Sequence, residues 1–105
     1  MTTLRRQIDT FVDHLGVERG LSRNTVEAYH RDLRRYEAFC SVRGLTDIAD
    51  VTLADLEAFS VALSQGDPPL SVASVTRALV AVRSLHRFTT AEERLASDPA
   101  AELTV

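Results

Sequence analysis

Arginine is the residue type in this sequence best suited to chemistry with a charged partner. All twelve basic residues of the chain are arginine, and none is lysine. A guanidinium group donates hydrogen bonds as a planar fork that matches phosphate oxygens and guanine edges, so arginine suits a nucleic-acid surface. A GC-rich genome also enriches arginine through its codons, and this is the simpler explanation of the bias. Residue type alone therefore does not decide the function.

The positions of the charges say more than their total. The net charge of −3 at first argues against a nucleic-acid partner. However, residues 19–43 carry six arginines against three acids, and residues 71–90 carry three arginines and no acid. Residues 44–70 carry five acids and no base. Because a polyanion meets local charge, the two positive segments are the candidate binding surfaces.

Both positive segments are predicted to be helices. The chain of 105 residues fits one domain, and apolar residues recur at helical spacing in four stretches. The first stretch is expected to stop near Gly16 or Gly20. The second opens at Ser22, a capping residue, and stops at Gly44. No strand alternation, internal repeat or low-complexity tract is found, so the fold class predicted is all-α, a small bundle of four to five helices.

The remaining helices have recognisable starts as well. The third is predicted to open at Thr52 with Asp55 as a weak capping box, and to break at residues 66–69, which read GDPP. The fourth is expected to open at Ser71 and to fade near residues 89–90. A short turn of helix is expected at 91–95, and Asp98 with Pro99 suggests one more start.

The apolar stripes define the predicted core and, by exclusion, the outer faces. The stripes of the four helices are Leu4, Ile8, Phe11, Val12, Leu15; Val26, Tyr29, Leu33, Tyr36, Cys40; Leu53, Leu56, Phe59, Leu63; and Val72, Val75, Leu79, Val82, Leu85. At about 100° per residue, the residues opposite the stripes are Asn24, Ala28, Arg31 and Arg35 in the second helix, and Ala73, Arg77, Ala81 and Ser84 in the fourth. Small residues mixed with arginine let a duplex approach closely, although a solvated face is the simpler explanation of the pattern alone.

The residues that usually support catalysis or metal binding have plainer interpretations here. Tyr29 and Tyr36 lie on the apolar stripe and are interpreted as core residues, and Cys40 as a small buried hydrophobe. The three histidines lie on different helices without a ligand at metal spacing, so no metal is expected. We predict no catalytic residue and no cofactor in this chain. No apolar run of membrane-spanning length and no signal-peptide core is present, and a lone cysteine fits a reducing cytoplasm.

Four motifs, in order, resemble one family. Residues 21–33, LSRNTVEAYHRDL, resemble the signature LS-x-NT-x-x-x-Y-x-x-DL of the tyrosine recombinases of the XerC/XerD and phage-integrase type. Residues 77–88, RALVAVRSLHRF, are similar to the helix R-x-L-S-A-(I/V)-R-x-(L/F)-(Y/H)-x-(Y/F) of that family. Residues 51–56, VTLADL, resemble its usual third-helix start, and 98–100, DPA, its closing motif. Within that family, the motifs resemble the XerD branch of actinobacteria more closely than the other branches.

The resemblance implies a SAM-like domain that covers one face of double-stranded DNA, as the N-terminal, core-binding half of a C-shaped clamp. In the family the second and fourth helices approach adjacent major grooves. The implied DNA contacts are Arg23, Asn24, Thr25, Ala28, Arg31, Ala73, Ser74 and Arg77, with Arg34, Arg35 and Arg87 as weaker phosphate contacts. Arg83 also falls on a family position, but it lies near the apolar boundary, which favours a structural bond to a helix end or carboxylate.

The resemblance also implies what lies outside residues 1–105. The family nucleophile, a tyrosine, and its helpers belong to a larger C-terminal catalytic domain, and none of their motifs is found here. We therefore expect an N-terminal domain of a longer recombinase, which acts in the cytoplasm on DNA together with its own catalytic domain and partner recombinase subunits in a tetramer. Such enzymes integrate elements or resolve chromosome dimers.

Two alternatives to DNA clamping are considered. A SAM-like protein-interaction module would use the acidic third helix as its partner surface and would not bind DNA. A helix-turn-helix repressor needs two helices within about 20 residues, whereas the two basic helices here are some thirty residues apart. The acids of residues 44–70 are interpreted as a solvated face. They are also expected to repel DNA, and neutralising Asp55 and Glu57 is the corresponding test.

Overall fold

The computed structural model describes residues 2–105, and this part of the chain is helical with no strand. The elements in order are α1 (Thr3–Asp13), η1 (His14–Glu18), α2 (Arg23–Val42), η2 (Ile48–Asp50), α3 (Leu53–Ser64), α4 (Val72–Glu93) and η3 (Pro99–Glu102). The all-α prediction is thus confirmed, with four α-helices and three shorter helical turns in residues 2–105.

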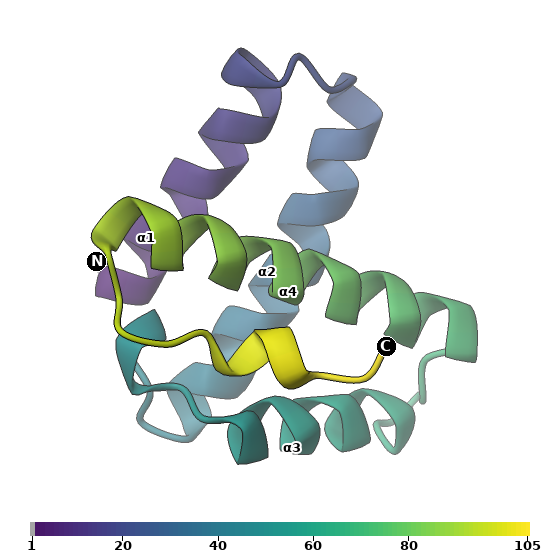
Figure 1. Ribbon diagram of the computed structural model, residues 1–105. Coiled ribbons are helices and arrows are strands. Elements are labelled where there is room, and N and C mark those ends of the chain that lie inside the picture. Colours follow the sequence, from purple (N-terminus) through teal and green to yellow (C-terminus); the bar gives the residue numbers. More distant parts are fainter. Residues whose placement is uncertain (1) are drawn as a thin grey trace.

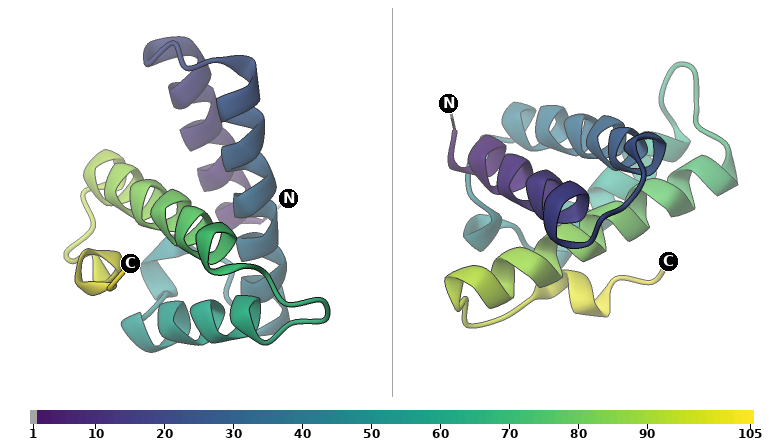
Figure 2. Two further views of the ribbon diagram at one scale, coloured as in Figure 1. Left: turned by 90° about the vertical axis from the view of Figure 1, so that its right-hand side faces the viewer. Right: turned by 90° about the horizontal axis from the view of Figure 1, so that it is seen from above.

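The helices α1 and α2 form an antiparallel hairpin that stands upright in Figure 1, and α4 crosses in front of it. The helix α3 lies across the opposite end of the molecule, and the C-terminal turn η3 fills the space between α3 and α4. Figure 2 shows from two further sides that α4 runs through the middle of the fold. It packs against α1, α2, α3 and η3, so more than one of its faces is buried.

Local sequence explains where the helices begin. The hydroxyls of Thr2, Ser22, Thr52 and Ser71 each accept a hydrogen bond from a backbone amide of the first helical turn. These bonds satisfy amides that lack a partner within the helix. The predicted starts at Ser22, Thr52 and Ser71 are confirmed, as is the turn at Asp98 and Pro99, which is the start of η3.

Helix ends were predicted less well. Gly44, with a φ of 75°, follows the end of α2 as expected. Gly16 does not stop the first helix, which continues as the π-helical turn η1, whereas Gly20 has the left-handed φ of 62°. The fading of α4 near Thr89 was wrong: α4 continues to Glu93, and Arg94 ends it with a φ of 53°. No separate turn follows at 91–95, because residues 91–93 extend α4 and the chain turns away from Arg94 on.

The core contains most of the predicted stripes, with two errors in α4. The side chains of Leu4, Leu15, Leu33, Leu56 and Leu85 are almost fully buried. Val72, predicted to be in the core, is 83% exposed because the first turn of α4 extends past its neighbours. Ala81, predicted to be outside, is buried, because α4 is packed on several sides and a single stripe underestimates what it buries.

Candidate nucleic-acid interface

The starts of α2 and α4 are built alike. Ser22 Oγ accepts from the Thr25 amide at 3.2 Å, and Ser71 Oγ accepts from the Ser74 amide at the same distance. In each pair the two hydroxyls are also bonded to one another, at 2.9 Å and 3.1 Å. Neither helix has an acid in its first turn. The positive end of each helix dipole is therefore not neutralised by a side-chain carboxylate, which favours an anion there.

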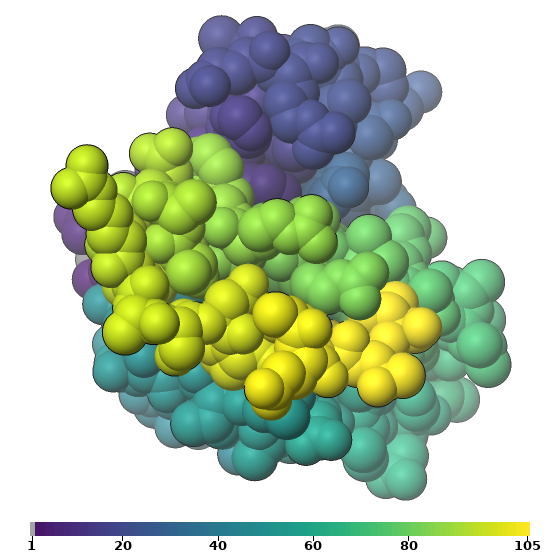
Figure 3. All heavy atoms as spheres, in the orientation of Figure 1, coloured from purple at the N-terminus to yellow at the C-terminus, as the bar shows by residue number. Residues whose placement is uncertain are grey.

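A hollow lies between the N-terminal half of α2 and the middle of α4. Its volume is about 340 Å³, and Figure 3 shows the surface indented on the right between the segments coloured blue and green. Its lining comprises Asn24, Thr25, Ala28, Tyr29, Asp32, Arg77, Val80 and Ala81. Four of these residues, namely Asn24, Thr25, Ala28 and Arg77, are predicted DNA contacts, so the fold brings candidates from both helices to one concave surface.

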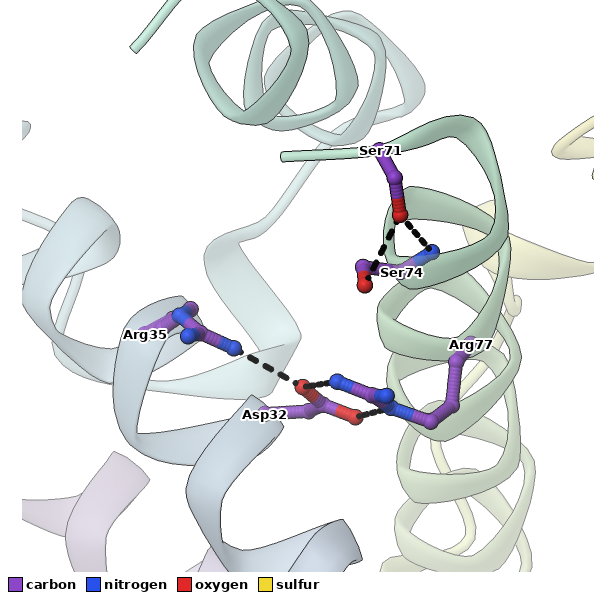
Figure 4. Close-up of polar contacts among 5 residues, drawn as sticks. All are labelled: Asp32, Arg35, Ser71, Ser74 and Arg77. Atoms are coloured by element: carbon purple, nitrogen blue, oxygen red, sulfur yellow. Dashed lines mark hydrogen bonds and ion pairs between the residues drawn. The ribbon is translucent and has the colours of Figure 1, made fainter. Parts of the chain in front are cut away.

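A buried carboxylate joins the two helices at this hollow. Asp32 of α2 is 1% exposed. Its two oxygens accept from Arg77 of α4, with Nε to Oδ2 at 2.8 Å and Nη2 to Oδ1 at 3.1 Å. Arg35 adds a third bond, from Nη1 to Oδ1 at 3.1 Å, and Figure 4 shows Asp32 between the two guanidinium groups. Two positive charges thus share one negative charge. The hydrogen bond from Arg77 to Asp32 raises the pKa of Arg77 above its ordinary value.

This cluster changes the interpretation of both arginines. The acid-poor face predicted from the sequence contains a buried acid after all, because Asp32 lies within it. Arg77 and Arg35 are held by a carboxylate, yet their side chains remain 46% and 39% exposed. Breaking such a group by removing one partner leaves a buried charge uncompensated, which is far more costly than losing a surface pair.

The remaining predicted arginines separate into two groups. Arg31 is exposed and has no carboxylate partner within residues 2–105, and it lies about 100° around α2 from Asp32. Arg34 lies on the other side of α2, where it lines a depression with Arg5 and Glu37. Arg23 lies about 180° from Asp32 on the same helix. The lining of the hollow therefore contains none of Arg23, Arg31 and Arg34, and Arg31 is the nearer of the exposed pair Arg31 and Arg34 to Asp32 around the helix.

The predicted contacts of α4 lie along its outward side. Ala73 and Arg87 are exposed, and Ser74 is half-buried beneath the Ser71 cap. Arg83 was expected to bond a helix end or a carboxylate, and this expectation was wrong. The part of the chain that the structure describes offers it no hydrogen bond or ion pair, so it is half-buried by packing alone.

The acidic segment is solvated in part, since Asp50, Glu57 and Asp67 are exposed as predicted, whereas Asp47 and Asp55 are bonded within the fold. Asp55 Oδ2 accepts from the Thr52 amide at 2.9 Å and completes a capping box. Asp55 Oδ1 accepts from Arg43 Nη2 at 2.9 Å, and the Thr52 amide, with Arg43 assisting, lowers the pKa of Asp55. Asp47 caps η2 and accepts from Gln7. These acids are structural, so neutralising Asp55 would test the stability of α3 before it tested any repulsion of DNA.

The candidate reactive side chains are buried, as predicted. Tyr36 is 1% exposed and Cys40 is fully buried, while Tyr29 packs against the core. Burial raises the pKa of Tyr36 above its ordinary value and that of Cys40 to about 11. Tyr36 Oη lies 2.7 Å from His86 Nε2, and burial lowers the pKa of His86 to about 4. These groups stabilise the core as neutral side chains.

Two structural residues escaped the sequence-based predictions, Asp32 and Gln7. Gln7 is 4% exposed and joins three elements: its amide donates to Asp47 and Glu93, and its carbonyl accepts from the Ile48 amide. Both residues fall near the edge of an apolar stripe, and a polar side chain at a core-facing position is the signal that could have found them. In residues 2–105 no cluster of His, Cys, Asp and Glu is arranged to hold a metal, and no described helix is long and apolar enough to cross a membrane.

Comparison with known proteins places the chain among recombinases. Residues 8–93 match the family described as "Phage integrase, N-terminal SAM-like domain". The chain is 50% identical over 97 residues to the tyrosine recombinase XerD of Mycobacterium tuberculosis, a match that covers 88% of this chain and 31% of that protein. It is 42% identical over 98 residues to XerD of Corynebacterium glutamicum, over 90% of this chain and 32% of the relative.

More distant relatives point the same way. The tyrosine recombinase XerC of Oceanobacillus iheyensis is 36% identical over 103 residues, which cover 98% of this chain and 33% of the relative. No solved structure is a significant match. The chain thus spans about a third of the length of the curated relatives that it matches, and the predicted resemblance to the XerC/XerD family is confirmed.

Proposed function

Because this chain belongs to the phage integrase family, as its N-terminal SAM-like domain, we propose that it binds double-stranded DNA across the hollow between α2 and α4. Residues 1–105 then form the N-terminal, core-binding half of the clamp of a longer tyrosine recombinase. The catalytic tyrosine, the other clamp half and the partner subunits of a tetramer belong to the rest of that assembly. The relatives carry the name tyrosine recombinase, and the proposal extends that activity to the parent protein of this domain.

The observation that carries the proposal is the shared geometry of two helix starts. Both α2 and α4 begin with a serine cap, lack an acid in the first turn and line one concave surface, α2 with its first turns and α4 with Arg77, Val80 and Ala81. Asn24 and Thr25 on one side and Arg77 on the other offer donors at its rim, where phosphates and base edges can accept them. Ala28 has a short side chain, so a duplex can approach the backbone of α2.

The acidic side of the molecule supports the same choice over a protein-interaction module. Such a module would present the acids of α3 to a partner, and of these Asp55 is bonded within the fold while Glu57 is exposed; Asp47, before α3, is bonded as well. The charges of Asp47 and Asp55 are directed to helix caps and to Arg43. Ion pairs and caps within the fold thus reduce the acidic charge that a partner could meet, whereas the exposed Arg31 remains available to an anion.

The experiment is a salt titration of DNA binding by two matched arginine variants of α2. We expect Arg31→Ala to lower the affinity for duplex DNA about three- to ten-fold and to reduce the slope of log K against log salt by about one. Arg34→Ala removes the same charge from the same helix at a position about 60° farther around from Asp32, so it should change affinity less than Arg31→Ala. Fluorescence anisotropy with a labelled duplex measures both.

The titration has two adverse outcomes with different meanings. Equal effects of Arg31→Ala and Arg34→Ala would show that net charge, and not distance from the hollow, sets the contribution of these arginines, and would count against a binding surface centred on the hollow. Absence of binding by the unmodified chain at low salt, with no chemical-shift change of α2 or α4 amides on adding duplex, would contradict DNA binding itself.

A further inference from the structure

Asp32 is a buried acid in the middle of a surface that is proposed to bind a polyanion. A carboxylate so placed ought to weaken the binding of phosphate, and nothing in the core requires a charge at that point. Its three hydrogen bonds all come from arginines, one on its own helix and one across the hollow on α4. The contact is therefore the charged link between the two helices that line the hollow.

The geometry of the link determines where the Arg77 guanidinium lies. Nε and Nη2 of Arg77 bind the two oxygens of Asp32 side by side, which is the two-bond fork that fixes an arginine in orientation as well as in distance. The remaining nitrogen, Nη1, donates to no acceptor in residues 2–105, and the side chain is 46% exposed. The free edge of the fork is thus held at the rim of the hollow and not left to rotate.

The charges in the cluster support this assignment. Asp32 contributes one negative charge, and Arg35 and Arg77 contribute one positive charge each, so the cluster keeps a net charge of +1. The buried carboxylate cancels one of the two positive charges that attract DNA. It also restrains the side chains of Arg35 and Arg77 before DNA binds, so that less rotational freedom is lost on binding. Ordering a flexible side chain before binding reduces the entropic cost of association.

We propose that Asp32 is a positioning residue for DNA binding, which holds Arg77, and with it Arg35, across the hollow so that the free edge of Arg77 donates to one DNA phosphate. The inference rests on the proposed function. Asp32 itself does not contact DNA. Its action is exerted through the arginine on the neighbouring helix, and it also fixes the approach of α2 to α4.

The first test uses the opposite signs that charge and positioning predict for one substitution. Asp32→Asn adds one positive unit to the net charge, so general electrostatics predicts tighter binding. If Asp32 positions Arg77, affinity for duplex DNA should instead fall about five-fold or more. The matched control is Glu27→Gln, which makes the same change of charge at an exposed position of α2 and should leave affinity unchanged or slightly higher.

The second test keeps every charge and changes only the fork. Arg77→Lys retains the positive charge and one bond to Asp32 but loses the bidentate geometry. We expect a folded protein, checked by circular dichroism, that binds DNA about three-fold or more weakly than the unmodified chain. This variant keeps the proposal open to refutation even if Asp32→Asn does not fold.

A nuclear magnetic resonance signal reports on the link without DNA. The Nε–H resonance of Arg77 should be protected from solvent exchange in the unmodified chain, lost in Asp32→Asn, and shifted when duplex DNA is added. Wild-type affinity in both Asp32→Asn and Arg77→Lys would overturn the positioning role. If Arg31→Ala still weakened binding in that case, the proposed function would stand and only this inference would fall.

Discussion

All four described α-helices begin with a serine or threonine cap. The third residue after the cap distinguishes the starts of α2 and α4 from the start of α3. In α2 and α4 the third residue after the cap is a hydroxyl, Thr25 or Ser74, whereas in α3 it is a carboxylate, Asp55. Asp55 closes a capping box and binds Arg43, so the start of α3 is satisfied within the fold. The starts of α2 and α4 carry no acid, and the start of α2 lines the hollow through Asn24 and Thr25. A hydroxyl cap followed by an acid, as in α3, thus gives a helix start that is neutralised within the fold. The same cap without the acid, as in α2 and α4, leaves a helix start that can face an anion.

The starts of α2, α3 and α4 all depend on the same hydrophobic core, and we expect acid to destabilise that core through His86. Burial lowers the pKa of His86 to about 4, against an ordinary value near 6.5. Between these values the unfolded chain binds a proton that the folded chain does not, so stability falls as the pH falls from about 6.5 to about 4, by on the order of 3 kcal/mol. Urea unfolding at a series of pH values measures this loss.

The control for the acid effect is a second histidine. His86→Gln should flatten the dependence over this pH range, whereas His30→Gln, which changes a half-buried histidine of α2, should keep it. An unchanged slope in His86→Gln would show that carboxylates, and not His86, cause the loss of stability.

Converting the starts of α2 and α4 to the α3 type should separate stability from binding. Thr25→Glu and Ser74→Glu each place an acid where α3 has Asp55 and can complete a capping box. We expect stability to rise by about 0.5 kcal/mol and DNA affinity to fall about ten-fold, which is about 1.4 kcal/mol, because the acid repels phosphate. Thermal unfolding and anisotropy measure the two effects. Loss of both quantities together would mean that the hydroxyls, and not the absence of an acid, matter at these starts.

The reverse exchange tests the other region. Asp55→Ser gives α3 the start that α2 has, and it removes the bonds to the Thr52 amide and to Arg43. Stability should fall by about 1 kcal/mol, the usual value of a cap, with DNA affinity within two-fold of the unmodified chain. A large gain in affinity would instead support repulsion of DNA by the acidic segment.

The smallest effect is expected at the far end of α4. Arg94 has a φ of 53°, which costs an L-residue energy that glycine does not incur. Arg94→Gly should raise stability by about 0.5 kcal/mol. Because Arg94 lies at the opposite end of α4 from Ser71, losing its charge should leave DNA binding unchanged, and a marked loss would extend the binding surface beyond the hollow.

Local features of the sequence sufficed to predict the helical class, the capped starts and most of the core. A serine or threonine cap acts on amides within one turn, and an apolar stripe is a property of one helix, so both can be predicted from residues close together in the chain. The four motifs also identified the family. Helix ends were harder to predict. The helix α4 continues past Thr89 and Thr90, because Gln7 of α1 donates a hydrogen bond to Glu93 in its last turn.

The site depended on contacts that no local pattern encodes. Counting charges included Asp32 only in the total of residues 19–43 and Arg77 only in that of residues 71–90, while the fold joins them across 45 residues of sequence. In the same way Arg35 pairs with Asp32, whereas Arg34, the preceding residue in the same arginine-rich run, lines a depression with Arg5 and Glu37. The sequence by itself determined which segments are helical and which carry positive charge. Only the tertiary structure decided which of those charges are neutralised, because pairing depends on the distance between atoms of different helices and not on spacing along the chain.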